Sequence, residues 1–360
     1  MANPGISHDT AREVLAAYAA CGKNQVQTAK CLGRARQTVA GQIRIAERMQ
    51  AAGILEKQFT VENIPSFDMP IDDLRELRRK TWQTRHAAET ARKLIQVKVH
   101  LDGHIGILHF GDPHIDDDGC NFPKLESDVE LCQNTPGLLA GNVGDLHNNW
   151  ICRLAALYGN QTTSAAQAWK LVEWFVKSLN WLYIVKGNHD CWSGAGDPLD
   201  FIKHAGIGAL EAHGARLNLV FPNRKQVRVN ARHDFAGHSM WNPNHGPVKA
   251  IKAGWRDHLL TCGHIHETGF GPPLKDPATG LISWPIRCAG YKVHDDYGNR
   301  LGLPDQNIAP SILTVIDPRY DDDDPRLITP FLSPEEGASY LTYLRKKAGA
   351  QDNGRRVRGR

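Results

Sequence analysis

The chain has 360 residues, of which 41% are hydrophobic and 23% charged, the composition of an ordinary globular protein with a sizeable core. It contains no apolar run of about 18 residues and no secretory signal, so we expect no membrane contact and a cytoplasmic location. Its eight cysteines form no CxxC pair, and we expect them to stay reduced.

The net charge of +4 is unevenly distributed along the chain. Residues 1–94 carry +5, residues 95–343 carry −7, and residues 344–360 carry +6. An acidic middle between basic ends is expected when cation-binding carboxylates lie centrally and contacts with polyanions lie at the ends. Solvated surface charges would give the same totals.

The first 55 residues have the pattern of a small all-α domain. Ser7 or Asp9 can cap a helix that runs to about residue 20, with a glycine just past its end. Asn24 can cap a second, short helix that ends at Gly33, and a third helix is expected from about Gln37 to residue 50.

Residues 27–43 (QTAKCLGRARQTVAGQI) resemble a helix-turn-helix. Ala29 would be the small residue between the helices, Gly33 the turn glycine and Val39 the apolar contact of the second helix. The second helix would present side chains suited to phosphates and base edges, which predicts DNA binding. A helical domain used only for structure or oligomerisation is the alternative interpretation. The candidate DNA-binding residues are Arg36, Gln37, Gln42 and Arg44.

Residues 56–94 are expected to form a linker followed by a basic helix from residue 71, and residues 344–360 a basic tail. Between them, residues 95–343 alternate strands with helices, which predicts an α/β catalytic domain. An Asp-Gly pair at 102–103 joins two strand patterns and predicts a β-hairpin. Further strands are expected at 138–143, 181–185, 226–232 and 259–262.

Polar clusters follow four of these strands, each beginning with a glycine. Such clusters converge because sites in α/β sheets form beyond the carboxyl ends of the strands. Carboxylates, imidazoles and an amide oxygen suit Mn²⁺, Fe or Zn²⁺, and the ligands are numerous enough for two ions that share a carboxylate. The clusters are Gly111-Asp112-Pro113-His114, Gly144-Asp145, Gly187-Asn188-His189-Asp190 and Gly263-His264-Ile265-His266.

The order DxH, GD, GNHD, H and GHxH over roughly residues 104–290 resembles the calcineurin-like metallophosphoesterases. The resemblance implies a two-sheet β-sandwich flanked by helices, here preceded by the helix-turn-helix domain. It also implies two divalent metal ions, with Mn²⁺ favoured and Fe, Zn or Ni as alternatives. A helix-turn-helix ahead of a phosphoesterase is similar to proteins encoded by phages or prophages, for which the location would be the host cytoplasm.

The resemblance also implies a role for each motif residue. Asp112, His114 and His266 would hold the first metal, and Asp145 would bridge both. Asn188, His264 and one intervening histidine would hold the second. Three candidates are open for the intervening histidine: His233, which directly follows a strand and is favoured, His238 and His245. His189 would protonate the leaving oxygen and Asp190 would orient its imidazole.

Weaker signals follow Gly144-Asp145. The resemblance places His147 and Asn148 where some members of the family bind a phosphate of the substrate, and Arg153 could approach the same oxygens, although turn and helix-cap roles are the favoured interpretation. The leading hypothesis is a two-metal phosphodiesterase that acts on DNA. The alternatives are a phosphomonoesterase for a phosphoprotein or nucleotide, and a DNA-binding regulator with an inactive phosphoesterase domain.

Overall fold

The computed structural model describes residues 5–55, 68–192, 199, 202, 206–294, 302 and 309–349. The chain divides into two compact units, Met1–Arg79 and Lys80–Arg360. Residues 56–67 of the expected linker and residues 350–360 of the expected tail lie outside the described residues. The eight cysteines, all described, are free thiols, as expected from the sequence.

The first unit contains the three predicted helices, α1 (His8–Ala20), α2 (Gln25–Cys31) and α3 (Arg36–Ala51). The side chain of Ser7 caps α1 and that of Asn24 caps α2, each by accepting backbone N–H groups of the first turn. Ala29 and Val39 are buried where α2 packs on α3, and Gly33 has the positive φ of +60° that the turn requires. Three short helices therefore enclose their own apolar core.

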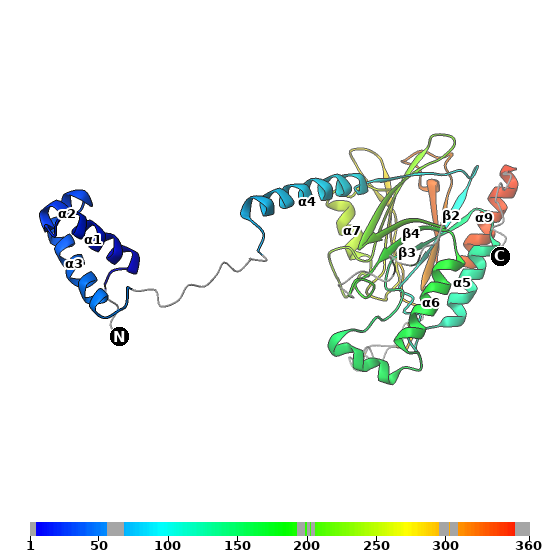
Figure 1. Ribbon diagram of the computed structural model, residues 1–360. Coiled ribbons are helices and arrows are strands. Elements are labelled where there is room, and N and C mark those ends of the chain that lie inside the picture. The colour runs from blue at the N-terminus through cyan, green and yellow to red at the C-terminus, as the bar shows by residue number, and fades with distance from the viewer. Residues whose placement is uncertain are drawn as a thin grey trace. The chain divides into compact units, whose positions relative to one another are not determined.

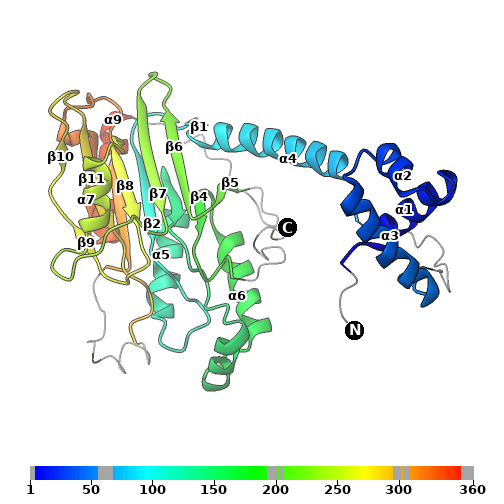
Figure 2. The same ribbon diagram turned by 90° about the vertical axis from the view of Figure 1, so that its left-hand side faces the viewer.

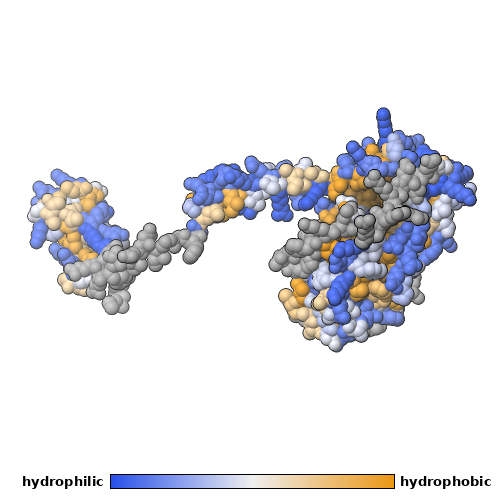
Figure 3. All heavy atoms as spheres, turned by 45° about the vertical axis from the view of Figure 1, so that its right-hand side comes forward, coloured by the Kyte–Doolittle hydropathy of each residue, from blue (hydrophilic) through white to orange (hydrophobic). Residues whose placement is uncertain are grey.

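The candidate DNA-binding residues lie on α3. Arg36, Gln37 and Arg44 are exposed, whereas Gln42 is half-buried and its side-chain oxygen accepts a bond from Arg34. The basic helix expected from residue 71 is α4 (Ile71–Arg92), which has no buried residue. Apolar side chains lie among hydrophilic ones along it (Figure 3). Among the described residues, no helix combines the length and the apolar composition needed to cross a bilayer.

The second unit is built on two mixed β-sheets (Figures 1 and 2). The first has the strand order β13-β12-β2-β3-β4-β5, and its strands β2 to β5 are parallel. The second has the order β1-β6-β7-β8-β11-β10, with β9 also paired to β11. The strands are β1 (Ile95–Lys98), β2 (Ile105–Phe110), β3 (Leu138–Asn142), β4 (Trp181–Lys186), β5 (Ile207–Ala212), β6 (Gly214–Val220), β7 (Gln226–Arg232), β8 (Leu259–Cys262), β9 (Gly269–Phe270), β10 (Leu274–Lys275), β11 (Ile282–Arg287), β12 (Ser311–Ile316) and β13 (Ile328–Phe331).

Alternation along the strands creates two apolar layers in this unit. Ile105 and Ile107 of β2 face residues such as Leu217 and Val229 of the second sheet in the core between the sheets. The alternate residues Leu108 and Phe110 pack in a second core against helices on the outside of the first sheet. The helical segments of this unit are α5 (Phe122–Asn134), η1 (Cys152–Asn160), α6 (Ala165–Ser178), α7 (His245–Lys252), η3 (Pro325–Leu327) and α9 (Pro334–Ala348). The predicted α/β class and two-sheet sandwich are confirmed.

The predicted hairpin across Asp102-Gly103 is wrong. β1 pairs in parallel with β6 in the second sheet, whereas β2 lies between β3 and β12 in the first. Gly103 has the positive φ of +75° that the sequence suggested, but the turn carries the chain from one sheet to the other. β2 is buried on both faces, whereas β1 is half-buried on one face, through Ile95 and Val97, and exposed on the other, so the two strands have different environments. Turn chemistry alone could not decide which strands pair.

His109 of β2 is a fully buried core histidine whose two ring nitrogens both have hydrogen-bond partners. Its Nδ1 lies 2.5 Å from the hydroxyl of Tyr183 and its Nε2 lies 2.9 Å from that of Thr314. Burial lowers the pKa of His109 to about 3, because the charged imidazolium would lose its hydration.

We therefore expect His109→Gln to make the second unit less sensitive to acid. The pKa of His109 is lower in the folded state than in the unfolded chain, so the unfolded chain binds an extra proton between about pH 6.5 and 3. The stability of the wild type therefore decreases as the pH is lowered through this range. The variant should lose about 1.4 kcal/mol per pH unit of that slope in urea unfolding between pH 6 and 4. The exposed His100→Gln variant should keep the wild-type slope, and identical slopes for all three proteins would refute the expectation.

Candidate metal centre

The polar clusters that follow five strands meet at one edge of the two sheets. β2, β3 and β4 are neighbours in the first sheet, and β7 and β8 are neighbours in the second. The two sets are joined because the backbone N–H of His264 donates to Asp112 Oδ2 over 2.6 Å. The loops at this edge carry all seven residues that the sequence predicts as ligands: Asp112, His114, Asp145, Asn188, His233, His264 and His266.

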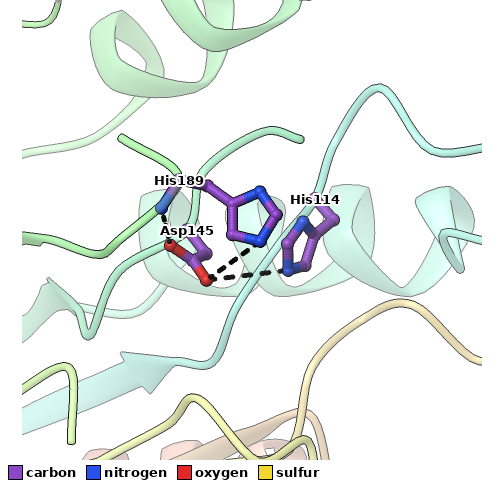
Figure 4. Close-up of side chains that lie close together, drawn as sticks. All are labelled: His114, Asp145 and His189. Carbon is purple, nitrogen blue, oxygen red and sulfur yellow. Dashed lines mark hydrogen bonds and ion pairs between the residues drawn. The ribbon is translucent and has the colours of Figure 1, made fainter. Parts of the chain in front are cut away.

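The carboxylate of Asp145 lies at the centre of this group. Its Oδ2 is 3.3 Å from Nε2 of His233, 3.9 Å from Nε2 of His114 and 4.0 Å from Nε2 of His189. Figure 4 shows the rings of His114 and His189 directed toward that oxygen. Burial by itself would favour the neutral acid, but the hydrogen bond and charge of His233 outweigh it and lower the pKa of Asp145. Asp145 is therefore held as a carboxylate.

Two groups of ligand atoms share this carboxylate. His114, Asp145 and His189 form one, and Asp145, His233 and His264 form the other, with the atoms of each group within 4.8 Å of one another. A carboxylate common to two clusters is the arrangement expected of a bridging ligand between two metal ions.

The cluster around His233 has the atoms of a cation site. Nε2 of His233 lies 2.8 Å from Oδ1 of Asn188 and 3.0 Å from Nδ1 of His264. Three other ligand atoms thus surround Nε2 of His233: Oδ1 of Asn188, Nδ1 of His264 and Oδ2 of Asp145. Burial opposes the positive charge of His233, but Asp145 and Asp112 raise its pKa to about 10, so the surrounding carboxylates favour a positive charge at this position.

The other side of the centre contains Asp112, His114 and His266. Oδ2 of Asp112 lies 3.4 Å from Nε2 of His266, and the rings of His114 and His266 are 5.0 Å apart between centroids. Oδ1 of Asp112 is buried and has no hydrogen-bond partner in the described part of the chain. A buried carboxylate oxygen without a partner is costly, and a metal ion would satisfy it.

Only one of the three candidates for the intervening histidine reaches the centre. His233 is buried, and its Nδ1 lies 3.0 Å from the carbonyl of Val143, which fixes the direction of its ring. His238 is 61% exposed and lies 3.5 Å from Asp234. His245 is exposed at the start of α7. The structure therefore favours His233, the residue directly after the strand.

Four of the ligand residues have a left-handed backbone. The φ angles are +40° for His114, +48° for Asp145, +73° for His264 and +53° for His266. Such angles are uncommon outside glycine and persist only where the surroundings enforce them. Their concentration here means that the loops are held in strained conformations that direct the side chains inward.

Glycines make room for these loops. A Cβ on Gly187 would collide with the carboxylate of Asp145, and one on Gly263 would collide with that of Asp112. Gly144, with φ of +127°, lies against the ring of His233 in the same way. In three of the four clusters the opening glycine is thus required by close approach of the backbone to a ligand, whereas a Cβ on Gly111 would collide with the carbonyls of Ala289 and Pro310.

Asn148 was predicted to bind substrate, but the structure gives it another place. Its side-chain oxygen lies 3.0 Å from Nδ1 of His114, and its carbonyl oxygen lies 2.5 Å from Nδ1 of His189. Its amide group donates to Asp117 and its backbone N–H donates to Asp116. Asn148 is buried and directed at the histidines, so it orients them rather than facing a substrate.

His147 is also buried rather than open to a substrate. Its ring packs edge-on against Trp169 with centroids 4.1 Å apart, and neither ring nitrogen has a hydrogen-bond partner in the described part of the chain. Burial lowers the pKa of His147 to about 3. The third candidate, Arg153, lies in η1, and its side chain is outside the described residues.

His189 and Asp190 differ from the expected pair. The carboxylate of Asp190 accepts backbone N–H groups of Leu146 and Gly187 over 3.1 and 2.8 Å, so it ties the β3 and β4 loops together. Burial, followed by the charge of Asp145, raises the pKa of Asp190 to about 8. The carbonyl of Asn148, and not Asp190, holds the imidazole of His189. A backbone carbonyl can only accept, which assigns the proton to Nδ1 and turns Nε2 toward the centre.

Arg287, at the end of β11, was missed by the sequence analysis. Its guanidinium is fully buried and donates to the carbonyls of Pro243 and Gly263 and to the carboxylate of Asp234. Two of these partners, Asp234 and Gly263, lie next to His233 and His264, so one side chain fixes both ligand loops of the second sheet. An arginine at the end of the apolar strand ISWPIR was the available signal, because charged groups enter a core only when fully paired.

No family model and no curated protein sequence matches this chain, but solved structures do. The calcineurin-like phosphoesterase YfkN of Bacillus subtilis is 12% identical, with a TM-score of 0.34 over 68% of this chain and 97% of its own. Vps29 of Chaetomium thermophilum is 15% identical, with a TM-score of 0.30 over 63% and 92%. The NAD nucleotidase NadN of Haemophilus influenzae is 10% identical, with a TM-score of 0.33 over 63% of this chain and only 49% of its own.

We expect Asn148→Ala to weaken metal binding. The substitution removes the oxygen that orients His114, and loss of such a partner typically costs about 10–100-fold in affinity. Titration of the metal-free protein with Mn²⁺ in a calorimeter measures the effect. Asn223 lies in the β6–β7 turn, where its side-chain amide donates to the carbonyl of Pro318. As the control, Asn223→Ala should bind Mn²⁺ as the wild type does. Equal affinities for all three proteins would show that Asn148 does not position a ligand.

Proposed function

We propose that the protein is a two-metal phosphodiesterase that acts on DNA. The observation that carries the proposal is the position of Asp145, whose single carboxylate belongs to two clusters of metal-ligating atoms, one with His233 and His264 and one with His114 and His189. Of these residues, His189 is assigned below to proton transfer rather than to metal binding. The clusters stand at the carboxyl ends of neighbouring strands, where sites in α/β sheets form.

The residues present fit two divalent ions of the Mn²⁺, Fe, Zn²⁺ or Ni²⁺ type. The donor set contains carboxylate, imidazole and amide oxygen groups and no thiolate, which favours hard or borderline cations, with Mn²⁺ proposed first. Asp112, His114 and His266 would hold one ion, Asn188, His233 and His264 the other, and Asp145 both. Bound ions would polarise the phosphoryl oxygens and lower the pKa of a water, so that a phosphoester could be hydrolysed at neutral pH.

His189 is placed to transfer a proton during this reaction. Its Nδ1 is bonded to the carbonyl of Asn148, and its ring lies 3.9 Å from that of Trp192 between centroids. These contacts fix the imidazole with Nε2 on the side of Asp145, 4.0 Å from Oδ2. The protonated ring can donate from Nε2 to the leaving oxygen of a substrate bound at the centre.

DNA is proposed as the substrate because of the N-terminal unit. α2 and α3 enclose a tight turn at Gly33, and α3 exposes Arg36, Gln37 and Arg44. Exposed arginines on the second helix of such a pair are suited to phosphates and to guanine edges. The metal chemistry itself is the same for diesters and monoesters, so the N-terminal unit supports the choice of substrate.

We expect the protein with Mn²⁺ to hydrolyse bis(p-nitrophenyl) phosphate, and His189→Ala to lower kcat by roughly 10²–10⁴-fold. Metal content, measured by elemental analysis, should be unchanged, because the proposed ligand sets do not include His189. His238→Ala, an exposed histidine outside the clusters, is the matched control and should keep wild-type turnover.

Two results would count against this assignment. Loss of metal in His189→Ala would make His189 a ligand rather than a proton donor. Inactivity of the wild type with Mn²⁺, Zn²⁺, Ni²⁺ and Fe²⁺ would favour a regulator with an inactive domain. Parallel assays with a model monoester and with single- and double-stranded DNA identify the preferred class of substrate.

Removal of residues 1–55 should weaken DNA binding and reduce its dependence on salt, because phosphate contacts made by α3 would be lost. Fluorescence anisotropy of a labelled duplex over a range of NaCl concentrations measures both quantities. Hydrolysis of bis(p-nitrophenyl) phosphate should persist, since the second unit has its own two cores. Unchanged DNA binding would remove the support for a DNA-directed N-terminal unit.

A further inference from the structure

The outer face of β6 and β7 carries an unusual set of side chains for a sheet. The odd-numbered residues of these strands, such as Leu217 and Val229, lie in the core between the sheets. The opposite face therefore presents Arg216 of β6 together with Arg228 and Arg232 of β7. In Figure 2, α7 lies over β8 and β11, while β6 and β7 are in open view beside it. We call the three arginines and Trp255 the arginine face.

Two of the three arginines have a buried counter-charge. Asp257 is fully buried, and its carboxylate accepts two bonds to Oδ1 and one to Oδ2 from Arg216, at 2.8–3.1 Å. Arg228 donates to the same carboxylate over 3.1 Å, and so does the amide of Asn230. One negative charge is thus shared between two guanidinium groups, and the face has an excess of positive charge before Arg232 is counted.

Arg232 has no counter-charge in the described part of the chain. Its Nε is buried without a hydrogen-bond partner, and no carboxylate of the described residues lies within ion-pair distance of it. Its guanidinium carbon lies 5.0 Å from the ring centre of Trp255 and 5.9 Å from that of Phe235. Aromatic rings hold a guanidinium in place but do not neutralise its charge. A half-buried arginine whose charge is not paired within the described residues can bind an anion from the solvent.

A second guanidinium lies beside the same ring, on the same face of the sheet and diagonally across the β6–β7 pair from Arg232. The guanidinium carbon of Arg216 lies 5.2 Å from the centre of the same Trp255 ring. Arg216 bonds Asp257 through Nε and Nη2, and its Nη1 makes no hydrogen bond within the described residues, so one donor remains for a ligand. Two guanidinium groups beside one ring form a site for a phosphate group, whose oxygens accept the paired N–H groups of arginine.

We propose that Arg232 and Arg216 bind a backbone phosphate of the nucleic-acid strand whose scissile phosphate occupies the metal centre. The proposal rests on the proposed function and extends it to a second contact on the substrate. Arg232 ends β7 and His233 follows it directly, so their Cα atoms are about 3.8 Å apart and the arginine face begins at the sheet edge that carries the centre. Trp255 is 36% exposed, and its free surface can take a base of the same strand.

Arg232→Gln tests the proposal, because the substitution removes the charge and keeps the stem that packs on Trp255. Binding of a fluorescein-labelled single-stranded oligonucleotide is measured by anisotropy in EDTA, which prevents cleavage, between 50 and 200 mM NaCl. Affinity should fall, and the slope of log K against log [NaCl] should become smaller by about 0.7, the value for one phosphate contact of a single strand. Arg232→Lys should recover most of the slope.

Arg326→Gln is the matched control. It makes the same change of charge at an arginine that is paired with Asp324 and stacked on Tyr320, and it should keep the wild-type affinity and slope. An Arg232→Gln protein that binds the oligonucleotide as Arg326→Gln does would overturn the inference. Binding of inorganic phosphate that Arg232→Gln abolishes, without an effect of the substitution on oligonucleotide binding, would assign the site to a free anion and overturn the inference as well.

Failure of the proposed function gives a different pattern. A wild-type protein that neither binds nor cleaves nucleic acid, yet hydrolyses a small phosphoester, would remove the DNA substrate and this inference with it. A wild-type protein that cleaves nucleic acid, combined with an unaffected Arg232→Gln variant, would remove only the inference.

Discussion

The carboxylate of Asp145 links the two sheets of the second unit. It follows β3 of the first sheet, yet its nearest imidazole is that of His233, which follows β7 of the second. The hydrogen bond from the backbone of His264 to Asp112 makes a second connection of the same kind. The site therefore exists only when both sheets are packed on their common core, because the first sheet supplies four of the seven candidate ligands and the second supplies three.

Such a group of buried acids and imidazoles is costly, and the surrounding structure offsets that cost with hydrogen bonds rather than with solvent. Asn148 orients two histidines at once, and Asp190 takes two backbone N–H groups from separate loops. Arg287 performs the same task for the loops of the second sheet. The strained backbone of His114, Asp145, His264 and His266 persists because these contacts leave the loops no alternative conformation.

Two arginines of this unit differ in whether their charge is paired within the protein, and this difference distinguishes a structural role from a role in binding a ligand. Arg287 is fully buried and has three acceptors, so its charge is used within the protein. Arg232 lies near two aromatic rings, and no carboxylate in the described part of the chain pairs with it. Its neighbour Arg216 already shares the carboxylate of Asp257 with Arg228. An internal arginine stabilises loops, whereas one whose charge is left over at the surface is available to a polyanion.

The order and spacing of the sequence motifs determined the α/β class, six of the strands, the helices of the first unit and six of the candidate ligands, with three histidines left open for the seventh. These features are local, because caps, periodicity and the polar clusters after strands depend on residues close together in the chain. The tertiary structure alone decided that β1 and β2 belong to different sheets, although an Asp-Gly turn joins them. It also decided that His233 rather than His238 or His245 reaches the centre, and that Asn148 and Asp190 hold loops in place. Those outcomes depend on which segments distant in sequence are brought together, and burial of the apolar faces of both sheets, not the local pattern, fixes that choice.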